Sequence, residues 1–400
     1  MKMLRESPAI WKQGMVRREI LPRLMRRLAV GSRRENFVAA AQLLDLAPGG
    51  EERAALMKGF EQAFEGGALP DLPEELVEAL AKDGQLSLTL RVRRGDQDAL
   101  VEAIRVVSDD KSEGAQRLRL IKTFGEVGYE QTTAVLLQNV GRGHDPAVRR
   151  AALAALQSFS SEDIGETVVR RYRSLTDDEQ PAAQALLASR PNWSRAWLAA
   201  IEAGTLNAKG AIPEAVAMLR RHSEEEVSQL VRKHFGESPA VPRRSRSARI
   251  LEVRSIIDEK PGNPYRGRPL FKQRCANCHV LFYSGGKIGP DLTSYQRDDL
   301  DTMLTSIIDP QAEIREGYEG FSVKTKEGRL LTGFLADGGP QHFTIRGFDG
   351  NDHSLSRDQI SEMTPLGRSL MPEGLLDDLG DQQVRDLFAY LRSAQPFLKD

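Results

Sequence analysis

The pentapeptide Cys275-Ala276-Asn277-Cys278-His279 contains both cysteines of this 400-residue chain and joins them to a histidine. Thiols three positions apart lie on one face of a helical turn, so each can form a thioether with a vinyl group of the same porphyrin. The imidazole that follows can then bind the iron. The motif therefore predicts one covalent c-type haem, held by Cys275 and Cys278, with His279 as an iron ligand.

Three other interpretations of the motif stay open. A thiol–disulfide redox site is expected in a βαβ setting, whereas the strand-like segments of this chain come later and suggest an antiparallel sheet. A structural zinc ion needs four ligands, and the chain has no second cysteine pair, although zinc could recruit His279 and one further histidine. The pair could also be idle thiols at the surface.

Composition narrows the class of protein. A chain of 400 residues is expected to form two or three domains, and a hydrophobic content of 40% is enough for well-formed cores. The formal net charge of −1 argues against a nucleic-acid partner held by bulk positive charge. No apolar stretch reaches the length of a transmembrane segment.

The N-terminal residues Met1 to Pro8 do not resemble a secretory signal, because they lack an apolar region and a small-residue cleavage site. Thioether attachment of haem, however, normally takes place where exported proteins fold. We therefore expect a periplasmic or otherwise exported protein. We interpret the chain as a fragment, or a late start, of a longer exported protein.

From about Trp11 to His234 the sequence predicts short amphipathic helices separated by glycine, proline and aspartate. The clearest begins with Asp145, which suits an N-cap, and Pro146, which suits the first helical position. An apolar stripe follows at three-to-four spacing, formed by Val148, Ala152, Leu156 and Phe159. This segment resembles a HEAT-repeat helix, and residues 117–125, 133–137 and 166–172 fit paired helices with a period of about 40 residues. We expect an α-helical HEAT-like repeat domain over residues 1–240.

Side chains of this region are expected to be structural. Arg149 and Arg150 are interpreted as part of a solvated helix face, because acidic residues are interspersed with the basic ones. Trp193 and Trp197, at positions i and i+4, are expected to be packing residues rather than a platform for a ligand. A protein partner on the repeats remains an option.

Residues 241–261 are predicted to be a linker and connecting helix. The basic run from Pro242 to Arg249 has few apolar residues, which indicates a surface crossing. A helical pattern from Ile250 to Lys260 then stops at Pro261. The next domain is expected to span residues 262–400.

This last domain resembles the small c-type cytochromes. Gly267, Phe271 and Cys275 follow at four-residue steps, and an apolar stripe near the C-terminus contains Val384, Leu387, Phe388 and Leu391. In that family the first and last helices cross in close contact, so Gly267 is expected to permit this approach. The resemblance implies an all-α cytochrome c-like domain.

The same resemblance implies two further site residues. Gly289-Pro290-Asp291-Leu292 matches the loop whose proline carbonyl accepts the ring N–H of the iron-bound histidine, so Pro290 would orient His279. Ser369 to Leu375 looks like the loop that delivers an axial methionine, so Met371 would be the second iron ligand. The alternatives for this second ligand are Met363 and a histidine (His342 or His353). The position on the iron could also be open. Met303 is expected in the core.

Period-two alternation between Tyr318 and Ile360 predicts a small antiparallel β insertion over residues 316–360. Strands are expected around residues 321–325, 331–335 and 343–345, separated by glycine-rich turns. The insertion explains the wide spacing between the cysteine motif and Met371.

Residues 262–400 as a whole resemble the haem-binding domain found in planctomycete and verrucomicrobial proteins, which HEAT-like repeats often precede. The resemblance implies electron transfer from a dehydrogenase to a respiratory acceptor. No catalytic residues are predicted, because no hydrolytic triad, paired acid–base site or phosphate-binding glycine loop is present. Two alternatives remain: a peroxidase-like haem enzyme or sensor with an open iron site, and a helical-repeat interaction scaffold with a vestigial haem domain.

Overall fold

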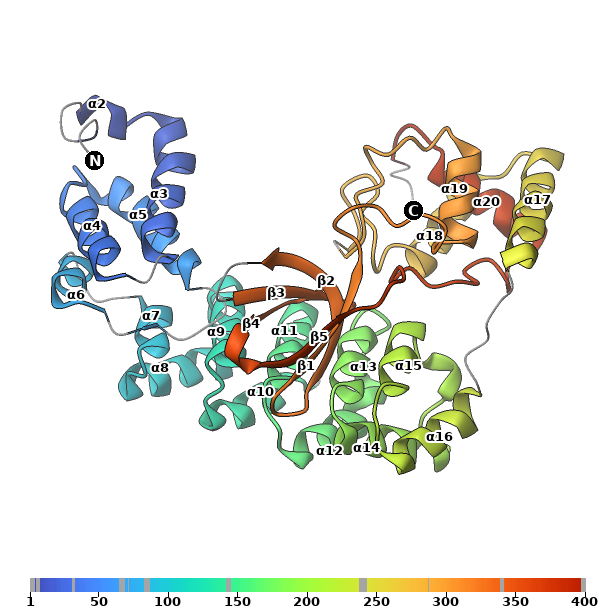
Figure 1. Ribbon diagram of the computed structural model, residues 1–400, viewed down its shortest axis with the longest axis horizontal. Helices are drawn as coiled ribbons and strands as arrows, with labels where there is room; N and C mark the ends of the chain where they lie inside the picture. Colours follow the sequence, from blue (N-terminus) through green and yellow to red (C-terminus); the bar gives the residue numbers. More distant parts are fainter. Residues whose placement is uncertain are drawn as a thin grey trace. The chain divides into compact units, whose positions relative to one another are not determined.

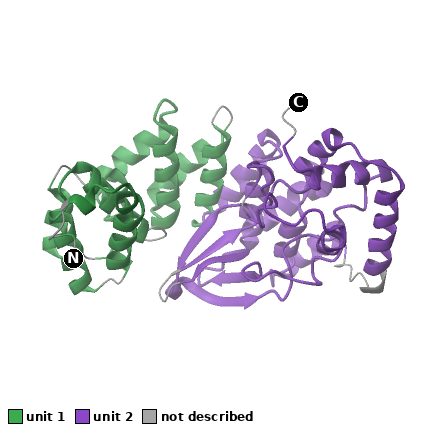
Figure 2. Cartoon of the chain, turned by 90° about the horizontal axis from the view of Figure 1, so that it is seen from above, with its two compact units in different colours: residues 1–159 green, residues 160–400 purple. Residues whose placement is uncertain are grey.

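The protein is mainly helical and carries one five-stranded antiparallel sheet among its described residues (Figure 1). The structure is a computed structural model that describes residues 4, 8–30, 33–64, 69–70, 72–82, 87–141, 145–236, 243–286, 288–338 and 342–396. It divides into two compact units, Met1–Phe159 and Ser160–Asp400 (Figure 2). Within the described residues no helix combines the length and the apolar character needed to cross a membrane.

Short helices that stack on one another make up the first unit. α3 packs against α5, α4 against α6, and α9 against both α11 and α7. Gly125 lets α9 and α11 approach, because a Cβ at this position would lie 2.8 Å from the Cα of Ala155. The elements are α2 (Pro8–Trp11), η1 (Val16–Ile20), α3 (Leu21–Val30), α4 (Arg34–Asp45), α5 (Gly50–Ala63), α6 (Glu74–Ala81), α7 (Leu88–Arg93), α8 (Gln97–Ser108), α9 (Gly114–Val127), η2 (Glu130–Thr132), α10 (Thr133–Asn139) and α11 (Pro146–Leu156).

The predicted start of α11 is confirmed, since the Asp145 carboxylate accepts a hydrogen bond of 2.7 Å from the Ala147 N–H. The predicted solvated face is wrong at Arg149, which is only 6% exposed. Both α9 and α10 pack against α11. Together they bury more of the surface of α11 than its apolar stripe, and Arg149 lies in this buried part. Arg150 is half-buried.

A second run of helices opens the second unit: α12 (Glu162–Arg171), η3 (Tyr172–Ser174), α13 (Gln180–Ala188), α14 (Pro191–Glu202), η4 (Ala208–Gly210), α15 (Pro213–Leu219) and α16 (Glu225–Phe235). As in the first unit, helices contact the next helix but one along the chain: α14 packs against both α12 and α16, and α13 packs against α15. The predicted packing roles of Trp193 and Trp197 are confirmed, as both are buried. The Trp193 indole N–H donates to the Ser161 carbonyl at 2.9 Å.

Four helices share the hydrophobic core of the C-terminal region: α17 (Arg243–Glu259), α18 (Pro264–Arg274), α19 (Leu300–Ile308) and α20 (Asp381–Leu391). α17 already begins inside the basic run that the sequence suggested to be a crossing, and residues 241–242 lie outside the described residues. Val253 of α17 is fully buried beside Phe271 and Phe388. The connecting segment is therefore a packed part of this region, and the two compact units do not divide at residues 240 and 262.

The predicted close contact between α18 and α20 is confirmed. A Cβ on Gly267 would lie 1.9 Å from the carbonyl oxygen of Asp386, so only glycine allows this approach. One turn further on, the rings of Phe271 and Tyr390 lie with their centroids 5.5 Å apart. The sequence places a small residue and an aromatic on one face of α18, and α20 packs on that face.

The sheet has the order β4-β3-β2-β1-β5. Its strands are β1 (Gly320–Thr325), β2 (Leu330–Gly338), β3 (His342–Gly347), β4 (Asp352–Ser356) and β5 (Ile360–Pro365). The first three strands were predicted, whereas β4 and β5 were not, and the sheet extends five residues beyond the predicted end at residue 360. Val323, Leu331, Ile345 and Leu355 form its small core.

Candidate functional site

The two cysteines lie on a single turn directly after α18. The Cys275 N–H donates to the Phe271 carbonyl at 2.8 Å, which continues the helical bonding into the motif. The N–H groups of Cys278 and His279 both donate to the Cys275 carbonyl, at 3.1 and 2.9 Å. Both thiols are free and half-buried. This turn brings Cys275, Cys278 and His279 together, as the spacing requires.

The imidazole of His279 is held in one orientation. Its Nδ1 donates a hydrogen bond of 2.9 Å to the Pro290 carbonyl, so Nε2 is the nitrogen left for a metal. Burial lowers the pKa of His279, and the Pro290 contact opposes this shift. The ring is therefore neutral at pH 7, which is the form that binds metals.

Gly289 packs directly on this imidazole. A Cβ at Gly289 would lie 2.5 Å from Cε1 and 3.0 Å from Nε2 of His279, well inside van der Waals contact. The residue before Pro290 thus has a steric reason to be glycine. The sequence GPDL supplies both the hydrogen bond and the space beside the ring.

A ladder of backbone hydrogen bonds fastens the following loop to the motif. The N–H of Gly286 donates to Ala276 at 2.7 Å, that of Gly289 to Cys278 at 2.7 Å, and that of Leu292 to Val280 at 2.8 Å. Gly285 and Gly286 pass so close to the motif that a Cβ on either would strike its carbonyl oxygens, at 2.1 and 1.9 Å. The motif is therefore enclosed by its own downstream loop.

An unusual turn interrupts this loop and was not foreseen from the sequence. Phe282 and Tyr283 both have positive φ, 53° and 65°, which is uncommon for aromatic residues. The Phe282 N–H donates to Thr293 Oγ1 at 2.9 Å, and its ring lies 5.0 Å from the Arg297 guanidinium carbon. Tyr283, in contrast, is 94% exposed.

Burial makes both thiols weak acids. It raises the pKa of Cys275 to about 12 and that of Cys278 to about 12. The Glu214 carboxylate, from α15, adds to the shift at Cys278. Burial also raises the pKa of Glu214 to about 7, while the charge of Arg368 opposes this shift. Sequence reasoning missed Glu214, because nothing local connects residue 214 with residue 278.

We expect slow alkylation of these cysteines. A thiolate is the reactive form, and a pKa of about 12 leaves few thiolates at pH 8. Labelling with iodoacetamide should therefore be at least about tenfold slower in the folded chain than in urea. Equal rates in the two conditions would contradict the burial of the thiols.

Met371 lies on a separate loop between β5 and α20. Its N–H donates to Ser369 Oγ at 3.1 Å, and the Ser369 N–H donates to Gln311 Oε1 at 2.8 Å. The Met371 side chain is half-buried, and neither the core that α17 to α20 share nor the core of the sheet includes it. Among those residues no hydrogen bond joins this loop to the turn that carries His279.

This loop is anchored from α17. Arg246 Nη2 donates to both carboxylate oxygens of Glu373, at 2.8 Å each, and Nη1 donates to Asp309 Oδ1 at 2.9 Å. The Arg246 side chain is 18% exposed. Because Glu373 is two residues from Met371, Arg246 fixes the position of the loop.

The rival ligands have structural positions of their own. Met303 is 6% exposed in the core, as predicted. Met363 lies in β5 opposite Val323 and packs against the core of the sheet. His353 is buried between Asp349, 3.3 Å away, and Arg329, whose Nη2 lies 3.0 Å from its Nδ1. His342 lies in β3, and its side chain is outside the described residues.

The turn brings together the side chains that could hold a cofactor or a metal. Two thiols, at positions 275 and 278, and one oriented, neutral imidazole, at position 279, lie on one turn. Among the described residues, no three histidine, cysteine, aspartate or glutamate side chains form a cluster suited to a metal ion. Neither the known protein-family models nor the curated proteins include a match to this chain.

Proposed function

We propose that this chain is an electron-transfer protein that binds one covalent haem c. Cys275 and Cys278 would form the thioethers, and His279 would be an axial ligand through Nε2. The observation that carries the proposal is the 2.9 Å hydrogen bond from His279 Nδ1 to the Pro290 carbonyl. It fixes the tautomer and the direction of the ring, as a ligating histidine requires.

Met371 is our proposal for the second axial ligand. Support comes from its side chain, which is outside the core of α17 to α20 and outside the core of the sheet, whereas Met303 packs in the first and Met363 against the second. The loop is also anchored by Arg246 and Gln311 rather than by the methionine itself. A thioether ligand stabilises reduced iron and raises its potential, which suits electron transfer.

The remaining parts of the chain are interpreted in the same way. Within each of the two units, helices that contact the next helix but one along the chain support a HEAT-like scaffold. We infer a relationship with the planctomycete and verrucomicrobial haem-binding domains, an exported location, and a dehydrogenase and a respiratory acceptor as redox partners. The helical scaffold is the proposed surface for a protein partner.

The test is expression of the exported chain together with a cytochrome maturation system. We expect one covalent haem per chain and a ferric low-spin spectrum with the methionine–sulfur charge-transfer band at about 695 nm. Met371→Ala should abolish this band and leave the covalent haem in place, whereas the matched control Met363→Leu should keep the band. A folded, colourless protein would refute the proposal.

Two further outcomes separate the alternatives. A high-spin iron in the unmodified protein would exclude His/Met ligation and favour the enzyme or sensor with an open iron position. Loss of the band in Met363→Leu but not in Met371→Ala would move the second ligand to β5.

Arg246→Met is predicted to weaken the ligation by Met371. Hydrogen bonds to charged groups contribute about 1.5–3 kcal/mol each, so losing the anchor on Glu373 should lower the fraction of Met-bound iron roughly ten- to hundredfold. The measurement is the intensity of the sulfur band and the reduction potential. Arg254→Met is the matched control, because Arg254 lies on the same helix and pairs with Asp301 instead.

A further inference from the structure

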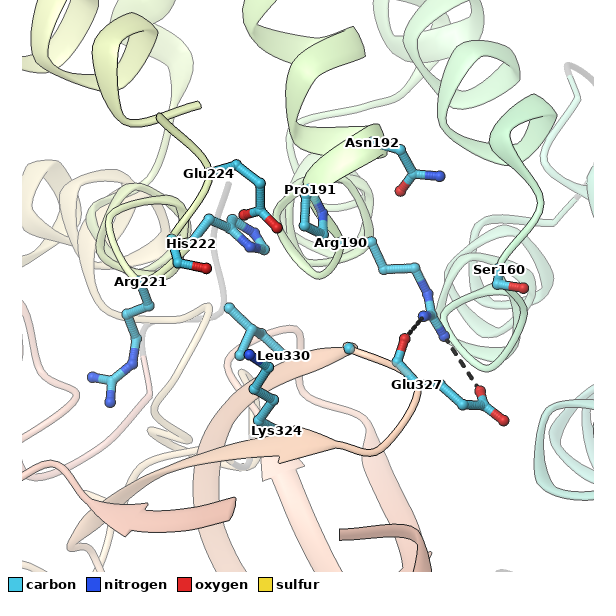
Figure 3. Close-up of a pocket in the computed structure, with 12 residues that line it drawn as sticks. Ser160, Arg190, Pro191, Asn192, Arg221, His222, Glu224, Lys324, Glu327 and Leu330 are labelled. Carbon is cyan, nitrogen blue, oxygen red and sulfur yellow. Dashed lines mark hydrogen bonds and ion pairs between the residues drawn. The ribbon is translucent and has the colours of Figure 1, made fainter. Parts of the chain in front are cut away.

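A cavity of about 320 Å³ lies where the ends of α13 and α15 meet the β1–β2 hairpin (Figure 3). It has no part in the proposed haem site, and no motif in the sequence indicated it. Its walls come from three separate stretches of the second unit: residues 190–192, residues 221–224 and residues 324–330, together with Ser160. The volume is near the lower end of the range for small-molecule sites.

The walls are held together by direct bonds. The Leu330 N–H donates to the Ser189 carbonyl at 2.8 Å, and Arg190 Nη1 donates to the Glu327 carbonyl at 3.0 Å. α15 packs against β2 beside these bonds. The hydrogen bonds and the packing keep the cavity formed, so a ligand would not have to assemble it.

The positive charge of Arg190 is only partly compensated in this cavity. Arg190 is 4% exposed, and the nearest carboxylate, that of Glu327, lies 3.9 Å away and is itself 76% exposed. Its guanidinium also lies 5.3 Å from the Trp193 ring. Within the described part of the chain its Nε has no hydrogen-bond partner. A buried cation with an open donor is costly unless an anion completes it.

More positive charge surrounds the same space. Lys324 and Arg221 also line the cavity, against the carboxylates of Glu224 and Glu327. Arg329 lies next to the lining: burial first, and then the charge of Arg190, lower its pKa to about 9. The carboxylates of Asp349 and Glu327 oppose this shift and compensate part of the charge of Arg329.

We propose that this cavity binds a small organic anion with a carboxylate or phosphate group. Arg190 would supply the buried charge and the planar donors that suit such groups. Lys324 would add a second charge from the hairpin, and Asn192 and Ser160 lie on the lining as neutral polar groups. The ligand would join α13, α14 and the sheet, in a role separate from the haem.

Isothermal titration calorimetry with three probes tests the site: succinate, inorganic phosphate and glucose. At low ionic strength we expect at least one of the two anions to bind with a dissociation constant below about 1 mM, and no heat from glucose. Comparison of the affinities for succinate and phosphate shows whether the cavity prefers a carboxylate or a phosphate group. No anion binding up to about 10 mM, or binding of glucose alone, would overturn the proposal.

Arg190→Gln should weaken anion binding at least about tenfold. The matched control is Arg195→Gln, which makes the same change in charge on α14, the helix that directly follows Arg190. Arg195 is exposed and pairs with Glu226. Equal affinities of the two variants would overturn the proposal. Thermal unfolding shows whether Arg190→Gln still folds. If it does not, Lys324→Gln replaces it and should weaken binding, whereas an unchanged affinity would refute the site.

Discussion

Replacing Gly267 by alanine should lower the free energy of unfolding of the C-terminal helices by at least about 3 kcal/mol. The added Cβ would lie 1.9 Å from the Asp386 carbonyl oxygen and 2.9 Å from the Tyr390 Cβ. The first obstacle is backbone, which cannot rotate away as a side chain can. α18 and α20 would therefore have to separate, and the core that Phe271 shares with Phe388 would open.

Hydrogen exchange of peptides from α18 and α20 is the suitable measurement, because it reports on this region alone. Gly114→Ala is the matched control: Gly114 begins α9, and no atom lies within 4 Å of the position its Cβ would take. There alanine should be neutral or stabilising by up to about 1 kcal/mol. Similar protection of α18 and α20 in the two variants would show that they do not touch at Gly267.

Gly289→Ala is expected to displace the imidazole of His279. With a Cβ 2.5 Å from Cε1, the ring must turn away and the hydrogen bond to Pro290 must lengthen. Strain of up to about 3 kcal/mol would reduce the correctly ligated fraction by up to about a hundredfold. In the haem-loaded protein we expect the low-spin spectrum to be largely lost, while both thioethers remain.

The spectrum and a mass measurement of the covalent haem check this result together. Gly210→Ala is the control in the same unit, because no atom lies within 4 Å of its Cβ position. A low-spin spectrum that survives in Gly289→Ala would mean that the ring does not depend on the space beside it.

The sequence predicted the helices best where capping and periodicity agreed. Asp145 and Pro146 marked the start of α11, and the stripe of Val148 and Ala152 marked its buried face. The prediction that Arg149 is exposed was wrong. The apolar stripe of one helix does not show how many neighbouring helices pack against it. The helix predicted from Ile250 to Lys260 is confirmed as part of α17, whereas the basic run before it was expected to be a surface crossing and instead belongs to the same helix from Arg243 on.

The sheet shows the same limit. β1 to β3 alternate clearly, but β4 contains the polar sequence DHSLS and directly follows a turn. β5, with the sequence ISEMTP, has no alternation and is a strand because it pairs with β1. Edge strands take their structure from a partner that is distant in sequence, so local periodicity cannot predict them.

The candidate site divides in a similar way. The hydrogen bond from His279 to the Pro290 carbonyl is local, and the motif with its GPDL loop predicted it. The turn at Phe282 and Tyr283 is also local, but the sequence did not indicate it. Other interactions join residues that are far apart in the sequence. Arg246 bonds to Glu373, 127 residues later, and Arg190 bonds to Glu327, 137 residues later. Glu214 contributes to the raised pKa of Cys278, 64 residues later. No spacing rule connects such positions, which is why only the folded chain showed them.

The backbone ladder that closes over the cysteine turn has a consequence for the order of assembly. The bonds from Gly286 and Gly289 to Ala276 and Cys278 form only when residues 285–286 and 288–292 lie against the turn. Once they form, the two cysteines are half-buried. On the proposed function, the porphyrin must therefore be joined to the chain before this loop settles. Cofactor insertion would then be an early step of folding, and maturation machinery would have to act on an open chain.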